Sequence, residues 1–376
     1  MIGIKVLQII SGNDNGGGGT HVLNIATNNE NNFHCIIGCI GDGPLYDKAI
    51  KAGFDTFLIK SKSTYLGSIK KLAIQNNIDL IDYHGAKAFF AHVFNKTRKI
   101  PSASTIHSNF RHDFLNSKMK KILFTQMSLN GLKSFDYFIC VSQYIKKLLI
   151  DEKFKGNKYV VNNGIDVSTI KCYKTREAIR CSYGISNNDF VFIMIARMHP
   201  VKNHLALIEA FSKLRRDTDK VKLILVGDGI LETKLKNRVQ ELNLYKDVVF
   251  TGCREDSSDF LRASDISILT SISEGGCPPL VVLESGALKK PIICSPVGDL
   301  DKIINGTNGY LVDPGSINDI YLKMKEAYSN RSNIEQMGEN LYKTVLTKFS
   351  MQNFCSNYYK IYQSIISNFY GDKKND

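Results

Sequence analysis

Residues 273–298 read SEGGCPPLVVLESGALKKPIICSPVG, and this stretch decides more about the protein than any other. An acidic glycine-proline loop at 274–279 runs into an apolar helical start, and a short strand follows at 291–294. Backbone N–H groups at the start of a helix hold phosphate, whereas carboxylates beside it, here Glu274 and Glu284, are suited to fixing hydroxyls. A nucleotide-sugar carries both kinds of group. The alternative is an ordinary loop and helix with two surface glutamates.

Short apolar runs alternate with helical patterns along the chain. Seven candidate strands lie between Lys5 and Val161, and six more lie between Phe190 and Val312. Strands that alternate with helices predict βαβ units and parallel sheets, with ligand sites at the carboxyl ends of the strands. We therefore expect an α/β protein of two Rossmann-like domains, joined near residues 165–188.

The chain ends in a stretch that predicts one amphipathic helix from Ser350 to Phe369, with Ser350 as its N-cap. The apolar residues in phase are Phe354, Tyr358, Ile361, Ile365 and Phe369. No apolar run reaches the length of about 18 residues that a membrane span needs. The start, MIGIKVLQIISG, is too short and strand-like for a signal peptide. Nine cysteines without a CxxC pair favour a reduced, cytoplasmic protein.

The formal net charge of +13 is concentrated in the first half of the chain. Residues 84–135 hold nine basic residues and one acid, Asp113. Part of this stretch, residues 115–132, predicts a basic amphipathic helix. Such a helix favours peripheral contact with the anionic lipids on the inner face of the cell membrane. The alternative is a solvated helix that covers the core. Nucleic acid is not expected as a partner, because no binding motif accompanies the charge.

Four consecutive glycines, 16–19, follow the first strand and precede a helix. Glycine allows a ligand to approach the backbone closely and leaves N–H groups for an anion. The run is not a spaced GxGxxG, and no acidic residue ends the second strand, so a dinucleotide site is disfavoured. The alternative is a flexible loop.

The second series of strands opens with IARMHPVKN, residues 195–203. Arg197 stands at the end of a strand, and Lys202 lies at the beginning of a helix. Two cations at a strand-to-helix turn suit a diphosphate, which they bind by charge-assisted hydrogen bonds together with the helix N-terminus. They would stabilise charge on a departing nucleoside diphosphate. Either cation alone would be a solvated surface charge.

The order of these segments resembles the GT-B glycosyltransferases of family 4, which retain anomeric configuration and use nucleotide-sugars. The matching segments span most of the chain. They are the glycine loop, TIHS at 105–108, FICVS at 138–142, NNGID at 162–166, IARMHPVKN, LILVGDGILETKL at 223–235, VVFTGC at 248–253, ASDISILTS at 263–271, the stretch at 273–298 and NGYLVDPGS at 308–316.

This resemblance implies a GT-B fold, in which two Rossmann-like domains have parallel sheets that face each other across a cleft. The expected parts are an acceptor domain at 1–168, a donor domain at 169–349, and a C-terminal helix at 350–370 that crosses back to the first domain. The resemblance also implies a nucleotide-sugar donor and no enzyme-bound metal. Asp299-Leu-Asp301 has the spacing of a DxD motif, but we interpret it as a loop or cap.

The roles that the resemblance implies fall on named positions. Catalytic roles fall on His107, Glu274, Arg197 and Lys202. The donor phosphates are assigned to Gly17, Gly18, Arg197 and Lys202, the base to Gly252 and Cys253, the ribose to Glu284, and the sugar to Glu274 and to the backbone of Gly276, Cys277, Pro278, Pro279 and Leu280. His84 is expected on the acceptor side.

One feature departs from the family pattern, which separates its two glutamates by seven residues. Nine residues separate Glu274 from Glu284, and alignment from PLVVLE puts Gly276 at the usual position of the first glutamate. Either the loop has gained two residues and Glu274 still reaches the sugar, or the first carboxylate is absent.

We therefore expect a hexosyltransferase-type glycosyltransferase that moves a sugar, with retention, from a nucleoside diphosphate donor to a glycan or lipid-linked acceptor. UDP-sugar is the favoured donor, and cell-surface polysaccharide biosynthesis is the favoured setting. The alternatives are a GT-B nucleotide-sugar epimerase, a phosphorylase, or a non-catalytic protein that binds a sugar nucleotide.

Overall fold

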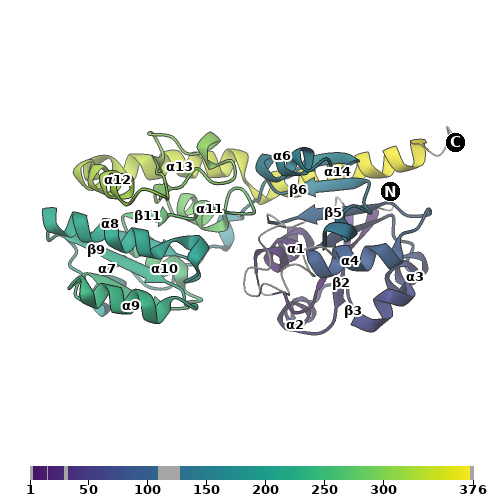
Figure 1. The fold of residues 1–376 in the computed structure, drawn as a ribbon, viewed down its shortest axis with the longest axis horizontal. Coiled ribbons are helices and arrows are strands. Elements are labelled where there is room, and N and C mark those ends of the chain that lie inside the picture. The colour runs from purple at the N-terminus through teal and green to yellow at the C-terminus, as the bar shows by residue number, and fades with distance from the viewer. Residues whose placement is uncertain (1–2, 15, 29–32, 109–127, 373–376) are drawn as a thin grey trace. The chain divides into compact units, whose positions relative to one another are not determined.

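The computed structural model describes residues 3–14, 16–28, 33–108 and 128–372. The stretch 115–127, which carries most of the expected basic helix, lies outside these residues. Contacts within the chain divide it into two units, each drawn in Figure 1. Unit 1 comprises Met1–Asn163 and Met351–Asp376, and unit 2 comprises Gly164–Ser350.

Unit 1 is built on a seven-stranded parallel sheet of order β3-β2-β1-β4-β5-β6-β7. Its strands are β1 (Ile4–Ser11), β2 (Phe33–Ile40), β3 (Thr56–Ile59), β4 (Leu80–His84), β5 (Ser102–Ile106), β6 (Tyr137–Cys140) and β7 (Asn157–Val160). Its helices include α1 (Gly17–Asn28), α2 (Pro44–Lys51), α3 (Ser68–Gln75), α4 (Ala86–Asn95), α6 (Gln143–Asp151) and α14 (Met351–Asp372), with the 3-10 turn η1 (Ser61–Leu66).

Unit 2 is built on a six-stranded parallel sheet of order β10-β9-β8-β11-β12-β13. Its strands are β8 (Phe190–Ile195), β9 (Val221–Val226), β10 (Val248–Gly252), β11 (Ile266–Leu269), β12 (Ile292–Cys294) and β13 (Gly309–Leu311). Its helices are α7 (Arg176–Ser182), α8 (His204–Asp217), α9 (Glu232–Glu241), α10 (Ser257–Ala263), α11 (Leu280–Ala287), α12 (Ile317–Ser329) and α13 (Ile334–Lys348). Short 3-10 turns are η2 (Val167–Thr169), η3 (Pro200–Lys202), η4 (Leu300–Lys302) and η5 (Arg331–Asn333).

Each strand order reverses direction at one point, between β1 and β4 in unit 1 and between β8 and β11 in unit 2. Ligands of open parallel sheets bind outside the carboxyl ends of the strands at such a point, because the crossovers on either side leave a crevice there. The candidate residues lie at these ends. The glycine loop follows β1, His84 ends β4, Arg197 follows β8, and the stretch at 273–298 follows β11.

The chain's last helix, α14 (yellow in Figure 1), belongs to unit 1 and covers one face of its sheet. Its side chains Phe354, Tyr358, Tyr362 and Ile365 are buried with Val6, Leu80 and Ala103 in one core cluster. Full burial of one such large apolar side chain stabilises the fold by about 1.5–3 kcal/mol. Ile361 and Phe369, which were also predicted in phase, are partly buried and pack against this cluster, and Tyr362, which was not predicted, is fully buried in it.

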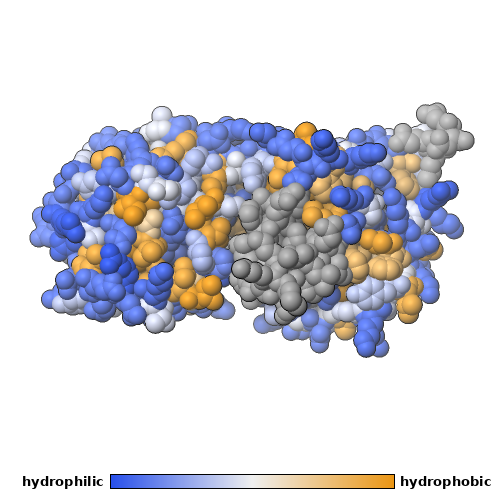
Figure 2. Space-filling model, viewed as in Figure 1, coloured by the Kyte–Doolittle hydropathy of each residue, from blue (hydrophilic) through white to orange (hydrophobic). Residues whose placement is uncertain are grey.

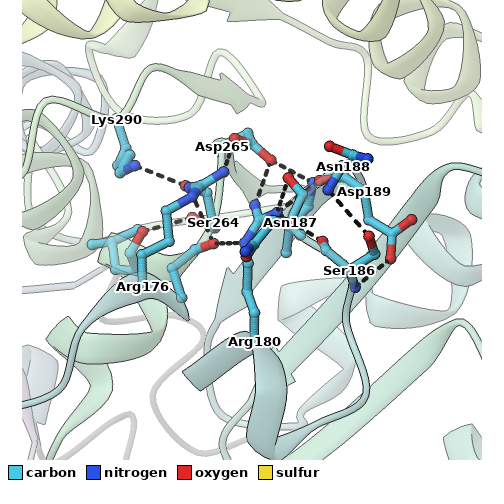
Figure 3. Close-up of polar contacts among 12 residues, drawn as sticks. Arg176, Arg180, Ser186, Asn187, Asn188, Asp189, Ser264, Asp265 and Lys290 are labelled. Atoms are coloured by element: carbon cyan, nitrogen blue, oxygen red, sulfur yellow. Dashed lines mark hydrogen bonds and ion pairs between the residues drawn. The ribbon is translucent and has the colours of Figure 1, made fainter. Parts of the chain in front are cut away.

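A buried arginine fixes the amino ends of the central strands of unit 2 (Figure 3). Arg180 from α7 is inaccessible to solvent. It pairs with Asp265 at 2.9 Å and donates to the carbonyl oxygens of Ala263, Ser186, Asn187 and Asp189. Because Asp265 immediately precedes β11 and Asp189 immediately precedes β8, these contacts hold the two strands in line at the edge opposite the candidate site.

The surface of both units is mainly hydrophilic on the face drawn in Figure 2. Within the described ranges, no helix combines the length and the apolar character that crossing a membrane requires. All nine cysteines are free, and five of them are buried: Cys39, Cys140, Cys277, Cys294 and Cys355.

Candidate active site

The turn after β8 presents the two cations that the sequence singled out. Arg197 is exposed, and its guanidinium makes no ion pair with any described residue. Lys202 ends the 3-10 turn η3, and Asn203 then takes a left-handed conformation (φ 60°) from which α8 starts. The Asn203 amide donates to the carbonyl of Pro314 at 2.7 Å, which holds the turn in place. Both cations therefore lie beside the amino end of a 14-residue helix, where the helix dipole also favours an anion.

The loop after β11 is held against this turn by the backbone. Ile272 N–H donates to the carbonyl of Val201 at 2.8 Å, and the Thr270 hydroxyl donates to that of Lys202 at 3.1 Å. Two residues later, the Glu274 carboxylate pairs with the Lys202 ammonium, and these side chains are 13% and 22% exposed. The structure therefore brings Glu274 to the cation despite the nine-residue spacing, and it is the backbone pairing that does so.

The rest of the loop is anchored in the core by Cys277. This side chain is fully buried, and its sulfur accepts a hydrogen bond from the N–H of Asp299 at 3.3 Å. Pro278 and Pro279 have no N–H, so neither can donate a backbone hydrogen bond to a ligand before α11 begins at Leu280.

Glu284 lies on α11 at the wall of a pocket of about 250 Å³. The pocket is lined by Thr169, Ile170, Lys171, Tyr173, Glu255, Ser257, Ser258, Leu261, Glu284 and Leu288. Burial raises the pKa of Glu284. Gly252 and Cys253 end the neighbouring strand β10, where Gly252 has a φ of 71° and Cys253 is exposed. Neither residue lines the pocket, although Glu255, two residues after Cys253, does.

The glycine loop of unit 1 opens α1, and a nearby acid uses part of it. Asp14 accepts hydrogen bonds from the N–H groups of Gly16 and Gly19, each at 2.9 Å. The amides of Gly17 and Gly18 have no partner among the described residues, so these are the two donors that the loop leaves for an anion. The sequence reasoning did not single out Asp14, although an Asp just before a glycine run is a typical helix-capping signal.

His107 lies next to this loop, since a methyl group added at Gly18 would be 3.6 Å from Cδ2 of the histidine. The His107 ring is partly exposed, and burial lowers its pKa to about 4. His84 stands behind it, with Nδ1 of His84 at 2.9 Å from Nε2 of His107. His84 is only 1% exposed and lies behind His107, away from solvent. Its expected place on the acceptor side stays a prediction.

Two family models match successive parts of the chain. The model described as Glycosyltransferase Family 4 matches residues 15–169, and the model described as Glycosyl transferases group 1 matches residues 175–344. The UDP-Gal:alpha-D-GlcNAc-diphosphoundecaprenol alpha-1,3-galactosyltransferase of Escherichia coli is 28% identical over 304 residues, covering 75% of this chain and 76% of that protein. The chain belongs to the family 4 glycosyltransferases. It is an enzyme of the hexosyltransferase type, as predicted.

Two further likenesses bear on this glycosyltransferase. The alpha-monoglucosyldiacylglycerol synthase of Streptococcus pneumoniae is 28% identical over 244 residues, covering 61% of this chain and 55% of that protein. The crystal structure of Anabaena HepE in complex with UDP and glucose superposes with a TM-score of 0.79 at 20% identity, covering 96% of this chain and all (100%) of that one. This likeness confirms the predicted GT-B fold, with two parallel-sheet α/β units.

In the part of the glycosyltransferase that the structure describes, no group of three or more His, Cys, Asp or Glu residues could hold a metal ion. Asp299 and Asp301 flank the start of η4, where Asp299 pairs with Lys302 at 2.9 Å. This ion pair within one turn agrees with the interpretation of the DxD spacing as local structure.

Proposed function

We propose that this enzyme transfers a sugar from a UDP-sugar, with retention of anomeric configuration, to a lipid-linked or glycan acceptor in cell-surface polysaccharide biosynthesis. The observation that carries the proposal is the pairing of Lys202 with Glu274 beside Arg197, at the reversal point of the unit 2 sheet. A diphosphate ligand needs the cations, and a sugar hydroxyl needs the carboxylate. A site that holds both kinds of group fits a sugar nucleotide.

The ion pair suggests how a donor would be received. A diphosphate that binds Arg197 and Lys202 competes with Glu274 for the ammonium group. Glu274 is then released to accept hydrogen bonds from hydroxyls of the transferred sugar. As the bond to the diphosphate breaks, the two cations and the amino end of α8 stabilise the charge that develops on the leaving group. These groups supply by fixed charge what a metal supplies in other enzymes, so we propose a metal-free reaction.

Glu284 would bind the ribose. A carboxylate that is raised in pKa by burial is stabilised when two hydroxyls donate to it, and the pocket beside Glu284 is lined by both polar and apolar side chains. Gly252 and Cys253 would contact the base through their backbone groups. Gly17 and Gly18 would offer their free amides to the donor phosphates.

The acceptor class is inferred from two observations. The printed names of the Escherichia coli and Streptococcus pneumoniae relatives refer to a diphosphoundecaprenol-linked sugar and to a glucosyldiacylglycerol. The basic stretch 84–135 would attract an anionic membrane in which such acceptors reside. Neutralising Lys118, Lys120 and Lys121 together should therefore weaken binding to anionic vesicles, and unchanged vesicle binding would argue against this contact.

The test is a transfer assay with a panel of UDP-, GDP- and ADP-sugars, each with and without a polyprenyl-diphosphate sugar acceptor. We expect release of UDP that depends on the acceptor, survives EDTA, and yields a product whose anomeric configuration, read by NMR, equals that of the donor. Arg197→Ala and Lys202→Ala should each abolish turnover. Acceptor-independent release of UDP and free sugar, or a product of inverted configuration, would contradict the proposal.

A further inference from the structure

Unit 1 contains a chain of buried hydrogen bonds that ends at His107. Gln8, Asp82 and His84 lie on the neighbouring strands β1 and β4 and are at most 1% exposed. Tyr362 of α14 completes the chain, and it is also fully buried. None of these side chains except His84 was singled out from the sequence. Polar groups are buried together in this way only when each finds a partner, because an unmade hydrogen bond in the interior costs about 1–3 kcal/mol.

The direction of each hydrogen bond can be worked out from the Asp82 end. The Asp82 carboxylate accepts from the hydroxyl of Thr105 and from that of Tyr362, both at 2.9 Å. A phenol has one hydrogen, so the oxygen of Tyr362 can only accept from its other neighbour, the Gln8 Nε2 group at 2.9 Å. This orients the Gln8 amide, and its oxygen Oε1 then lies 2.6 Å from Nε2 of His84.

The same reasoning continues through the two histidines. An amide oxygen only accepts, so Nε2 of His84 must carry a hydrogen. Burial and the neighbouring histidines hold the pKa of His84 well below its usual value, so the ring is neutral and its Nδ1 is a bare acceptor. That Nδ1 lies 2.9 Å from Nε2 of His107, which must therefore be the donor. In neutral His107 the remaining nitrogen, Nδ1, keeps its lone pair.

The outer end of the chain is the ring of His107, which is partly exposed. Nδ1 of His107 has no hydrogen-bond partner among the described residues. The glycine loop lies at the other edge of the same ring, since a Cβ at Gly18 would be 3.6 Å from Cδ2 of His107. An acceptor nitrogen without a partner on a partly exposed ring is what the hydroxyl of a ligand would satisfy.

We infer that Tyr362, Gln8 and His84 are positioning residues that fix the tautomer of His107, with its hydrogen on Nε2 and its Nδ1 presented as an acceptor to a hydroxyl of the donor sugar. The last part of this inference rests on the proposed function, whereas the tautomer itself does not. A histidine with the other tautomer would offer a donor to the sugar, and the hydroxyl would lose its acceptor. This chain of hydrogen bonds thus determines whether His107 accepts a hydrogen bond from the sugar or donates one to it.

The tautomer can be read in the free, full-length protein by NMR. Imidazole-¹⁵N-labelled histidine is incorporated, and long-range proton–nitrogen correlations are recorded at pH 8, above the value of about 7 to which burial raises the pKa of Asp82. The His107 signals are assigned by their loss in His107→Gln. We expect a protonated Nε2 and a bare Nδ1 for His107. A hydrogen on Nδ1 would overturn the inference whether or not the protein transfers a sugar.

The Tyr362→Phe variant removes the hydroxyl that orients Gln8, and we expect it to turn His107 into a mixture of tautomers. The matched control is Tyr358→Phe, which removes another fully buried hydroxyl of α14 that bonds Nε2 of His21 at 2.6 Å and not Gln8. This control should leave the His107 tautomer unchanged. If Tyr362→Phe folds poorly, Gln8→Met breaks the same chain at the next link and should give the same mixture.

Kinetics then test the consequence for the sugar. We expect Tyr362→Phe to lower kcat about tenfold, the value of roughly one hydrogen bond, and to leave the affinity for UDP unchanged. Tyr358→Phe should keep kcat within about twofold. If the tautomer of His107 and kcat are both unchanged in Tyr362→Phe, the chain of hydrogen bonds does not fix the tautomer, and the inference is overturned. A mixed tautomer with no loss of kcat would overturn the role of Nδ1. A fixed tautomer in a protein that transfers no sugar would instead refute the proposed function.

Discussion

The pairing of Glu274 with Lys202 leads to an unusual expectation for Glu274→Gln, namely that UDP binds more tightly while sugar transfer slows. In the unliganded structure the carboxylate occupies the ammonium group that a diphosphate needs. Exposed ion pairs are worth up to about 1 kcal/mol, and breaking a buried one costs about 3–5 kcal/mol. With side chains 13% and 22% exposed, this pair lies between these limits, so we take about 1–2 kcal/mol.

A gain of that size would lower the dissociation constant of UDP by about 5- to 30-fold at low salt. Transfer should respond in the opposite direction. Loss of a charged hydrogen bond to a sugar hydroxyl removes about 1.5–3 kcal/mol, which would reduce kcat/KM by about 10- to 150-fold. Added salt should shrink the gain in UDP affinity, because it screens a partly exposed charge.

Isothermal titration with UDP measures the affinity, and acceptor-dependent release of UDP measures transfer. The matched control is Glu339→Gln, which removes another unit 2 carboxylate paired with a lysine, Lys289, at 2.6 Å. It should change neither quantity. If Glu274→Gln binds UDP as weakly as the wild type or more weakly, then Glu274 does not compete with the ligand for Lys202, and the reasoning fails.

Three further outcomes are expected for stability. Arg180→Ala should destabilise unit 2 by about 3–5 kcal/mol in urea unfolding, because it removes the buried donor of the Asn187 and Asp189 carbonyls and leaves Asp265 with Arg176 as its one remaining ion-pair partner among the described residues. The exposed Arg238→Ala should change stability by under about 1 kcal/mol. Gly338→Ala should cost about 1–3 kcal/mol, since its Cβ would collide with the Lys289 carbonyl; Gly306→Ala, which has open space, is the control, and equal melting temperatures would contradict the packing argument. Acid should lower the melting temperature as the pH falls from about 6.5 to 5, because buried histidines stay neutral in the fold but take up protons on unfolding. Each such histidine lowers the free energy of unfolding by up to about 1.4 kcal/mol per pH unit. A melting temperature that does not change over this pH range would refute the argument. The histidines concerned are His21, His84, His92, His107 and His204.

Two carboxyl groups oppose the acid effect. Burial raises the pKa of Asp82 to about 7, so the folded protein binds a proton there that the unfolded chain releases between about pH 4 and 7. Burial raises the pKa of Glu284 as well. These two carboxyls favour the fold as the pH falls and offset about two of the five histidines, so the net effect of acid remains destabilising.

The architecture could be predicted from the sequence because each strand and helix differs in residue type from the residues that flank it in the chain. Apolar runs bounded by glycine, proline and polar residues mark each of the strands β1 to β13, and the alternation with helices implies parallel sheets. The cations Arg197 and Lys202 could be found for the same reason, since both lie in the short segment between the end of β8 at Ile195 and the start of α8 at His204. Features of this range are fixed by near neighbours in the chain.

The surroundings of the candidate histidines could not be predicted, because they depend on contacts between distant residues. Gln8 and Tyr362 hydrogen-bond across 354 positions of sequence, and no local pattern connects them. A partial signal was present: polar residues at 82, 84, 105 and 107 repeat with a period of two, which puts them on one face of adjacent strands. This pattern could have suggested that His84 is buried behind His107.

The spacing of the two glutamates could not be resolved from the sequence for a related reason. A count of nine residues describes only the distance along the chain. The position of Glu274 is set by the hydrogen bond from Ile272 to Val201, which lies on a different strand-to-helix turn. Pairing between two loops, which sequence spacing does not record, decided where the carboxylate lies.

The membership of α14 in unit 1 has a consequence for how the protein is made. The ribosome delivers residues 164–350, which form the whole of unit 2, before it delivers Phe354, Tyr358, Tyr362 and Ile365, which close the core of unit 1. Unit 2 is therefore able to finish folding first, although its sequence comes second. Until the last helix emerges, the strands of unit 1 carry an uncovered apolar face. A released chain that ends at residue 350 should accordingly protect unit 2 from protease and leave unit 1 open to cleavage.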